Sequence, residues 1–272
     1  MWPLERSVGG DCLRVGRVAV ERWSPTATGL SLLASHALQA DVPAQLDSLA
    51  TAIKLLCEDK PKGAVNLLLE SAWLPLLLVD TGGLLWSPSQ VRALAQHQFE
   101  SLYGDDALAW ELRVEHAIGT RFALAYGLPH RLKQCLLGTL GQIGVTCDAM
   151  VPAFAWGWHK LQPDRHWPRR TGWWAWPEQD RLLLARIQAG RIVALNAGLE
   201  ATDNAEGIVE HVDAESVRLG LDSPSSPVGV ASWKAPQNLS QGNPRVTWAP
   251  LGDVAPSSRA AFVGQPQTES SS

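Results

Sequence analysis

The sequence predicts a mixed α/β protein, and three observations lead to that prediction. Short apolar or alternating runs of strand length are interleaved with segments whose apolar residues recur every three or four positions. The strands and helices so predicted do not alternate strictly, which excludes an all-parallel doubly wound sheet and favours mixed sheets covered by helices. With 272 residues, of which 46% are hydrophobic, the chain can bury one large core or two smaller ones.

Strand patterns and one helix account for the start of the chain. Residues 12–23 alternate apolar and polar side chains around Gly16, which predicts two short strands or one bent strand. The segments that follow predict, in order, a strand, a helix and two short strands: residues 30–40, 43–57, 64–69 and 74–79.

The next helix has the clearest signals in the sequence. Ser87 can cap it, Pro88 suits its first position, and Gln90 completes a capping box. Apolar residues line one face as far as Leu102, and Gly104 can end the helix.

Strand patterns predominate in the second half, separated by two helical segments. The helices are expected at residues 129–143, which Gly144 can end, and at residues 152–160. A weaker helical segment precedes the last predicted strand. The strands are expected at residues 109–117, 121–126, 145–147, 173–176, 181–188, 191–196 and 216–221.

This order of elements indicates two successive units, each of strands followed by a helix. We expect an N-terminal extension at residues 1–11, a first lobe at 12–105 and a second lobe at 106–221; a ribonuclease-H-like or actin-like body is a natural solution. Residues 222–272 are rich in Ser, Pro, Gly, Gln and Asn. Such a segment buries too little apolar surface to offset its ordering entropy, so we expect a disordered tail.

Charge, hydropathy and cysteine content narrow the class of function. A net charge of −4 gives no general attraction to nucleic acid or anionic lipid. No apolar run reaches the roughly 18–20 residues that span a bilayer, and Trp2, Pro3, Glu5 and Arg6 interrupt any signal-peptide core. The four cysteines form no C-x-x-C pair, which favours reduced thiols over zinc or disulfides. A soluble cytoplasmic protein is expected.

The segment LLLVDTGG at residues 76–83 presents Asp80 as aspartic proteases present their catalytic aspartate. Those enzymes need two carboxylates that share a proton, and the chain has no second Asp-Thr-Gly or Asp-Ser-Gly. Two glycines lead from Asp80 straight towards the capped helix, as in an ordinary turn. We interpret Asp80 as a turn residue, with a dimeric aspartic hydrolase as the alternative.

Other residues of catalytic type lack the neighbours that their chemistry requires. His97 and Glu100 stand at i, i+3 on the capped helix, but no second ligand pair accompanies them, so a solvated face is expected. His116 is expected to be an ordinary strand residue. No glycine-rich nucleotide-binding motif or nucleophile elbow occurs in the sequence.

Six of the thirteen tryptophans fall between Trp156 and Trp176, together with several basic residues. Trp and Arg are enriched in protein-binding hot spots, which favours a partner-binding surface. Stacking on single-stranded nucleic acid is disfavoured by the acidic chain, and burial of the tryptophans in the neighbouring helix and strand is the other alternative. The candidate partner-binding residues are Trp156, Trp158, Trp167, Arg169, Arg170 and Trp173.

Residues 12–221 resemble the actin-like cytoplasmic proteins of type IV pilus assembly and type II secretion. These include the pilus-assembly M protein, the mannose-sensitive-pilus I protein and the cytoplasmic domain of the secretion L protein. The resemblance is carried by the segments CLRVGRVAVERW, NLLLESAWLPLLLVDT, ALAQHQFESLYG, RFALAYGLPHRLKQCLLGTLGQIGVTCDAMVPAF and RLLLARIQAGRIVAL. It implies an actin-like fold, ATP between the lobes in several members, and docking onto the short cytoplasmic N-terminus of a bitopic inner-membrane partner.

The sequence departs from the nucleotide-binding members at both phosphate-binding hairpins. The first, residues 14–17, has no carboxylate to order magnesium, and the second, residues 176–180, has no glycine for close approach to a phosphate. We therefore expect no cofactor, and a non-enzymatic scaffold of a pilus or secretion assembly at the inner face of the inner membrane. The alternative is an actin-like ATPase that binds ATP weakly through Glu178 or Asp180.

Overall fold

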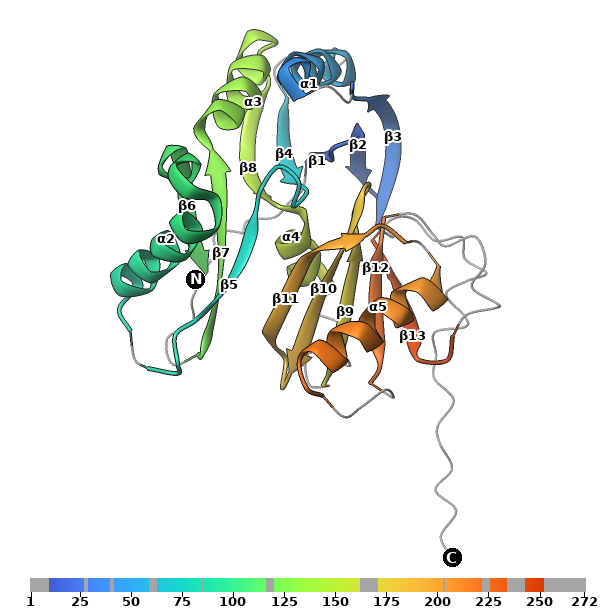
Figure 1. The fold of residues 1–272 in the computed structure, drawn as a ribbon. Helices are drawn as coiled ribbons and strands as arrows, with labels where there is room; N and C mark the ends of the chain where they lie inside the picture. Colours follow the sequence, from blue (N-terminus) through green and yellow to red (C-terminus); the bar gives the residue numbers. More distant parts are fainter. Residues whose placement is uncertain are drawn as a thin grey trace, which may run out of the picture.

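The chain folds into three sheets with helices packed around them, which confirms the predicted mixed α/β class (Figure 1). Two of the sheets have five strands and one has three. The computed structural model describes residues 10–26, 29–39, 42–58, 63–84, 86–115, 120–161, 171–202, 204–221, 226–233 and 243–251.

The first sheet has the strand order β3-β2-β1-β4-β8. Strands β1, β2 and β3 are antiparallel neighbours, whereas β4 and β8 run parallel to β1. Helices α1 and α3 lie side by side at this sheet (Figure 1). The strands are β1 (Asp11–Val15), β2 (Ala19–Pro25), β3 (Leu30–Ala37), β4 (Ala64–Leu69) and β8 (Thr146–Pro152), and the helices are α1 (Val42–Cys57) and α3 (His130–Gln142).

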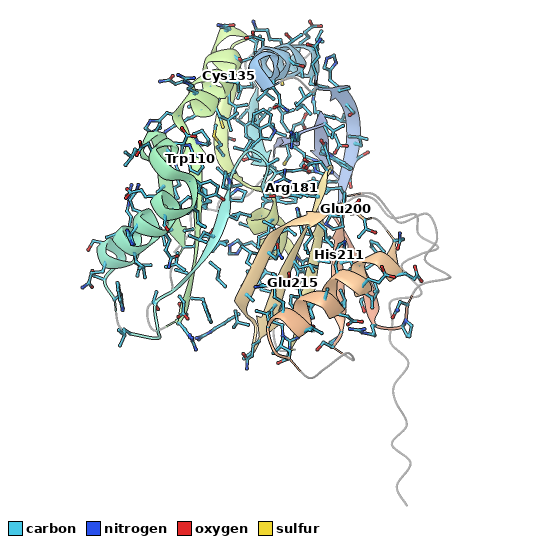
Figure 2. The ribbon with its side chains drawn as sticks, in the orientation of Figure 1. Trp110, Cys135, Arg181, Glu200, His211 and Glu215 are labelled. Carbon is cyan, nitrogen blue, oxygen red and sulfur yellow. The ribbon has the colours of Figure 1, made fainter. Side chains whose placement is uncertain are left out.

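The second sheet repeats this topology, with the order β11-β10-β9-β12-β13. Three antiparallel strands come first, and two parallel strands follow after helix α5, whose apolar face packs on the sheet. The elements are β9 (Gly172–Pro177), β10 (Arg181–Gln188), β11 (Arg191–Glu200), α5 (Ala205–Arg218), β12 (Val228–Ser232) and β13 (Val246–Pro250). Arg181, at the start of β10, lies where the two five-stranded sheets meet (Figure 2).

A three-stranded antiparallel sheet of order β5-β7-β6 is inserted between β4 and α3. Helix α2 covers it, and the predicted capping box is present: Ser87 accepts from the Gln90 N–H, and the Gln90 side chain accepts from the Ser87 N–H. Phe99 of α2 is buried against the sheet. The elements are β5 (Leu76–Asp80), α2 (Pro88–Tyr103), the 3-10 helix η2 (Gly104–Ala109), β6 (Trp110–Glu115) and β7 (Phe122–Pro129).

Helix α4 (Ala153–Leu161) follows β8 and joins the two five-stranded sheets through an aromatic core. The Trp156 ring of α4 stacks on that of Trp233 with a centroid distance of 5.5 Å, and Trp233 also contacts Trp23 of β2 and Trp176 of β9. The largest core cluster therefore contains residues from both sheets. None of the helices in the described ranges is both long enough and apolar enough to cross a bilayer.

Two sequence predictions about the C-terminal part are wrong. The expected tail does not begin at residue 222, because β12 and β13 complete the second sheet and the side chains of Val228 and Val230 are fully buried. The strand expected at residues 216–221 is instead the end of α5, where the Ser216 hydroxyl donates to the Val212 carbonyl, and the turn that follows it. Residues 222–225, 234–242 and 252–272 of the predicted tail lie outside the described residues.

The arrangement of the sheets does not test the predicted division into two lobes and an N-terminal extension. A division near residue 105 would separate β8 from β4, its neighbour in the first sheet. As a statement about domains, that division stays a prediction. Residues 1–9 of the expected extension lie outside the described part of the chain.

Candidate functional site

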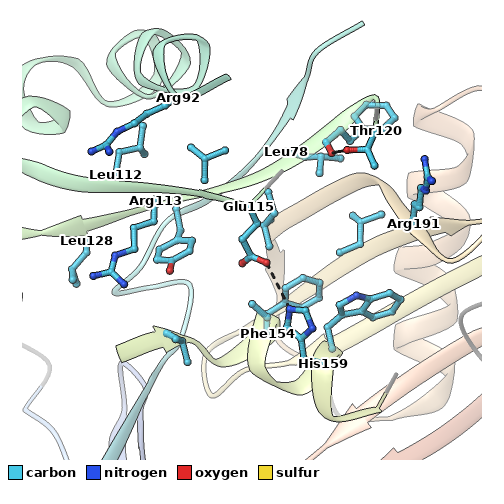
Figure 3. Close-up of a pocket in the computed structure, with 18 of the residues that line it drawn as sticks. Leu78, Arg92, Leu112, Arg113, Glu115, Thr120, Leu128, Phe154, His159 and Arg191 are labelled. Atoms are coloured by element: carbon cyan, nitrogen blue, oxygen red, sulfur yellow. Dashed lines mark hydrogen bonds and ion pairs between the residues drawn. The ribbon is translucent and has the colours of Figure 1, made fainter. Parts of the chain in front are cut away.

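A cleft of about 1260 Å³ lies between the three-stranded sheet on one side and β8, α4 and the β10–β11 turn on the other (Figure 3). Apolar side chains from several of these elements line it, among them Leu112, Leu124, Met150 and Phe154. This volume exceeds the roughly 300–1,000 Å³ of ordinary small-molecule sites. The cleft is therefore large enough for a segment of another chain.

Two strands that are outermost in their sheets, among the described residues, border the cleft. Strand β6 is the outer strand of the three-stranded sheet, and β8 is the outer strand of the first sheet. Residues 112–115 of β6 and 147–151 of β8 line the cleft. An outer strand presents backbone N–H and C=O groups that a further extended segment can pair with.

A contact between a carboxylate and an imidazole ring crosses the cleft, from β6 to α4. The Glu115 carboxylate and the His159 ring point towards each other (Figure 3), with 3.7 Å between Oε2 and Nε2. The Glu115 Oε1 atom is buried and has no hydrogen-bond partner among the described residues. Burial raises the pKa of Glu115, and the neighbouring His159 partly offsets that rise. Glu115 can therefore take a further hydrogen bond from a group that enters the cleft.

Cations outnumber carboxylates in the lining of the cleft. Its lining includes five cations and two carboxylates: Arg92, Arg113, Arg121, Lys133 and Arg191, with Glu115 and Asp148. Glu111, outside the lining, pairs with both Lys133 and Arg113, which together lower the pKa of Glu111 to about 2. A polar rim around an apolar floor is the usual composition of a protein–protein interface.

The second place of interest is the contact between the β1–β2 turn and the β9–β10 turn. These are the two hairpins at which the resemblance places the phosphates of ATP. The Gln179 carboxamide oxygen accepts from the backbone N–H of Val18 (3.1 Å) and of Ala19 (2.8 Å). A Cβ at Gly16 would overlap this carboxamide, so only glycine permits the close approach. The first hairpin's amides are thus occupied by a side chain of the second.

Buried carboxylates surround this contact. Glu70, directly after β4, is fully buried, pairs with Arg14 of β1 and accepts the Gln179 N–H at 3.2 Å. Ser71 donates its N–H (2.8 Å) and its hydroxyl to the two carboxylate oxygens of Glu178. Burial and the nearby Glu70 charge raise the pKa of Glu178 to about 8, and burial raises the pKa of Glu70 despite its pairing with Arg14.

Asp80 lies in the turn that the sequence predicted for it. Its exposed carboxylate accepts the Gly82 N–H at 2.8 Å and three hydrogen bonds from the Arg121 guanidinium, which lower the pKa of Asp80. Gly82 and Gly83 both have positive φ. These contacts are those of a turn, and the protease alternative is not favoured.

The remaining chemical candidates do not assemble into a site. Among the described residues, no group of three or more His, Cys, Asp or Glu side chains is placed to hold a metal. On α2, His97 is exposed and Glu100 accepts from the Gln96 side chain. His116 lies outside the described residues.

The predicted partner-binding residues fall in different surroundings. Trp156 and Trp173 are buried in the core, where the packing alternative placed them, and Trp158 is half-buried and lines the cleft. The other three, Trp167, Arg169 and Arg170, lie outside the described residues. Partner binding by these side chains stays a prediction.

Sequence reasoning missed most of the cleft. Glu115 has no local signal beyond its position on a predicted strand, and the outer positions of β6 and β8 depend on pairings between distant segments. His159 lies in the tryptophan-rich stretch, where nothing in the sequence pairs it with Glu115.

No protein-family model matches the sequence, and no curated protein sequence matches it. Several solved structures resemble the fold. The cytoplasmic domain of EpsL, an inner-membrane component of the type II secretion system of Vibrio cholerae, matches with a TM-score of 0.51 and 15% identity over 88% of this chain and 89% of that one.

Two further structures match to a similar degree. One is a protein with an actin-like ATPase fold and unknown function from Bacteroides thetaiotaomicron, with a TM-score of 0.53 and 10% identity over 89% of this chain and 87% of that one. The other belongs to the PilM–PilN type IV pilus biogenesis complex, with a TM-score of 0.51 and 16% identity over 79% of this chain and 67% of that one. The chain therefore has the actin-like fold found in these pilus and secretion components, which confirms the resemblance predicted from residues 12–221.

Proposed function

We propose that the protein is a non-enzymatic interaction protein of a type IV pilus or type II secretion assembly, located at the cytoplasmic face of the inner membrane. The observation that carries the proposal is the cleft between the three-stranded sheet and β8 with α4. The structural likeness to the EpsL cytoplasmic domain and to the PilM–PilN complex supports the choice of system.

The proposed occupant of the cleft is a short cytoplasmic segment of a bitopic inner-membrane protein. An extended segment could add its backbone to the outer edge of β6 or β8, while its apolar side chains cover Leu112 and Met150. A donor group of the segment could reach the free Oε1 atom of Glu115. Backbone pairing would supply affinity, and the polar rim would select the partner.

Nucleotide hydrolysis is disfavoured by the contact between the two hairpins. A phosphate there would have to displace the Gln179 carboxamide from the amides of Val18 and Ala19. It would then lie close to the buried carboxylates of Glu70 and Glu178. The phosphate charge would add to the burial and repulsion that already oppose ionisation of these carboxylates, so we infer that the hairpins do not bind ATP.

Binding of labelled partner peptides tests the proposal. The probes are fluorescent peptides that span the cytoplasmic N-termini of bitopic membrane proteins encoded next to this gene, and the readout is fluorescence anisotropy. We expect one of them to bind saturably at micromolar concentration. Ala149→Trp, which fills the cleft from β8, should weaken binding at least tenfold.

Ala34→Trp is the matched control, because it makes the same change at an exposed position of β3, the opposite outer strand of the first sheet. It should bind as the wild type does, and both variants should keep the wild-type circular dichroism spectrum. Equal binding by the two variants would place the partner elsewhere on the protein.

A further inference from the structure

The turn between β9 and β10 is anchored on the first sheet through three consecutive residues. The Glu178 carboxylate accepts the Ser71 N–H. Gln179 accepts from the β1–β2 turn through its carboxamide oxygen and donates its backbone N–H to Glu70. Asp180 pairs with Arg17 at 3.7 Å. Each contact joins residues more than a hundred positions apart in the sequence. The five-stranded sheets are thus fastened to each other at the point where an actin-like cleft would open.

The contact between Ser71 and Glu178 and the Glu70 carboxylate are buried, whereas the Arg17–Asp180 pair lies at the surface. Glu70 is 0%, Ser71 6% and Glu178 7% exposed. A buried polar group costs free energy unless it is hydrogen-bonded. Moving the sheets apart would leave the Glu178 carboxylate and the Ser71 hydroxyl to be satisfied by water, so their contacts specifically stabilise the closed arrangement.

The Gln179 carboxamide oxygen occupies the position in which a bound anion would accept hydrogen bonds from the first hairpin. It accepts two backbone N–H groups of the first hairpin, and Gly16 leaves the room that this approach needs. Closure of the sheets around the hairpins therefore requires no ligand.

Charge makes this contact sensitive to protonation. Arg14 of β1 is the buried cation that faces three buried carboxylates: Glu21 of β2, Glu70 after β4 and Glu178 after β9. Full ionisation would place the like charges of Glu70 and Glu178 near each other at a buried site, with the half-exposed Arg17–Asp180 pair and Arg181 at its edge. Burial and the repulsion between these two carboxylates both disfavour full ionisation, so a proton on this cluster stabilises the closed form.

We propose that Glu70, Ser71, Glu178 and Gln179 form a latch that holds the two five-stranded sheets closed without a ligand, and that deprotonation of its carboxylates loosens it. This inference stands independently of partner binding in the cleft, which lies at the three-stranded sheet.

The pH dependence follows from the direction of the pKa shift. The pKa of Glu178 is raised to about 8 in the folded protein from an ordinary value of 4.5. The folded protein therefore binds the extra proton between these values, and its stability falls as pH rises through that window. Glu70 shifts in the same direction because of burial.

Amide hydrogen exchange of the full-length protein tests the latch at its amides. Gln179→Ala should speed exchange at Val18 and Ala19 at least tenfold at pH 7. Gln188→Ala, at the opposite end of β10, is the matched control and should leave that exchange unchanged. Wild-type exchange rates in Gln179→Ala would overturn the proposal. So would a wild-type protein in which these amides are protected only after magnesium ATP is added.

A second variant keeps the test independent of how well Gln179→Ala folds. Glu178→Gln keeps an acceptor and removes the titrating group, so its melting temperature should vary less between pH 6 and pH 8.5 than that of the wild type. At pH 8.5 it should melt at a higher temperature than the wild type. A pH dependence equal to that of the wild type would show that Glu178 is not the titrating element of the latch.

Discussion

Arg14 shows how the surroundings of a single residue decide what a site can do. Its guanidinium contacts Glu21 at 3.1 Å, pairs with Glu70 and lies 4.9 Å from the centre of the Trp233 ring. The sequence predicted only that this hairpin lacks a carboxylate to order magnesium. It could not predict that Glu70 and Gln179 would fill the space, because these residues lie far along the chain and carry no local signal.

At this scale we predict that Arg14→Met destabilises the fold by about 3–5 kcal/mol, because it leaves the buried Glu70 carboxylate without its cation. Arg17→Met is the control: Arg17 is half-exposed and pairs with Asp180 at 3.7 Å, so its loss should cost at most about 1 kcal/mol. Urea unfolding at pH 7 measures both. Equal losses would mean that the buried pair contributes no more than a surface pair.

At the scale of elements, local signals predicted helix α2 well and strand β12 not at all. The Ser87 capping box, Pro88 and Gly104 are readable in the sequence and appear in the structure. Strand β12, VGVAS, is short and only weakly apolar, and its assignment depends on β9 and β13, which flank it. The sequence predicts a strand where α5 ends, because the apolar residues near Leu219 and Leu221 have no clear helical period.

We predict that truncation after Leu221 removes the folded second sheet, because it deletes β12 and exposes the edge of β9. Burial of Val228 and Val230 alone corresponds to about 3–6 kcal/mol. Truncation after Leu251 is the matched control, since it retains both strands. Thermal melting followed by circular dichroism should show a large fall only for the shorter chain; equal melting curves would mean that β12 and β13 contribute nothing to stability.

At the scale of the molecule, two sheets of the same topology and an inserted three-stranded sheet create two different kinds of junction. The junction between the five-stranded sheets is closed by the latch, whereas the junction at the three-stranded sheet leaves the cleft open. The order of elements predicted a two-lobed body. It did not predict the pairing of β8 with β4, because parallel strands distant in sequence share no local pattern.

Hydrogen exchange in the presence of each possible ligand tests the proposed function most directly. With the partner peptide that binds in the anisotropy assay, we predict slower exchange along β6 or β8 and unchanged exchange at residues 16–19. With magnesium ATP at millimolar concentration, we predict no change at any of these places. Protection of residues 16–19 and 178–180 by ATP, with none along β6 or β8 on adding peptide, would contradict the proposal and identify the protein as a nucleotide-binding member of the actin-like fold.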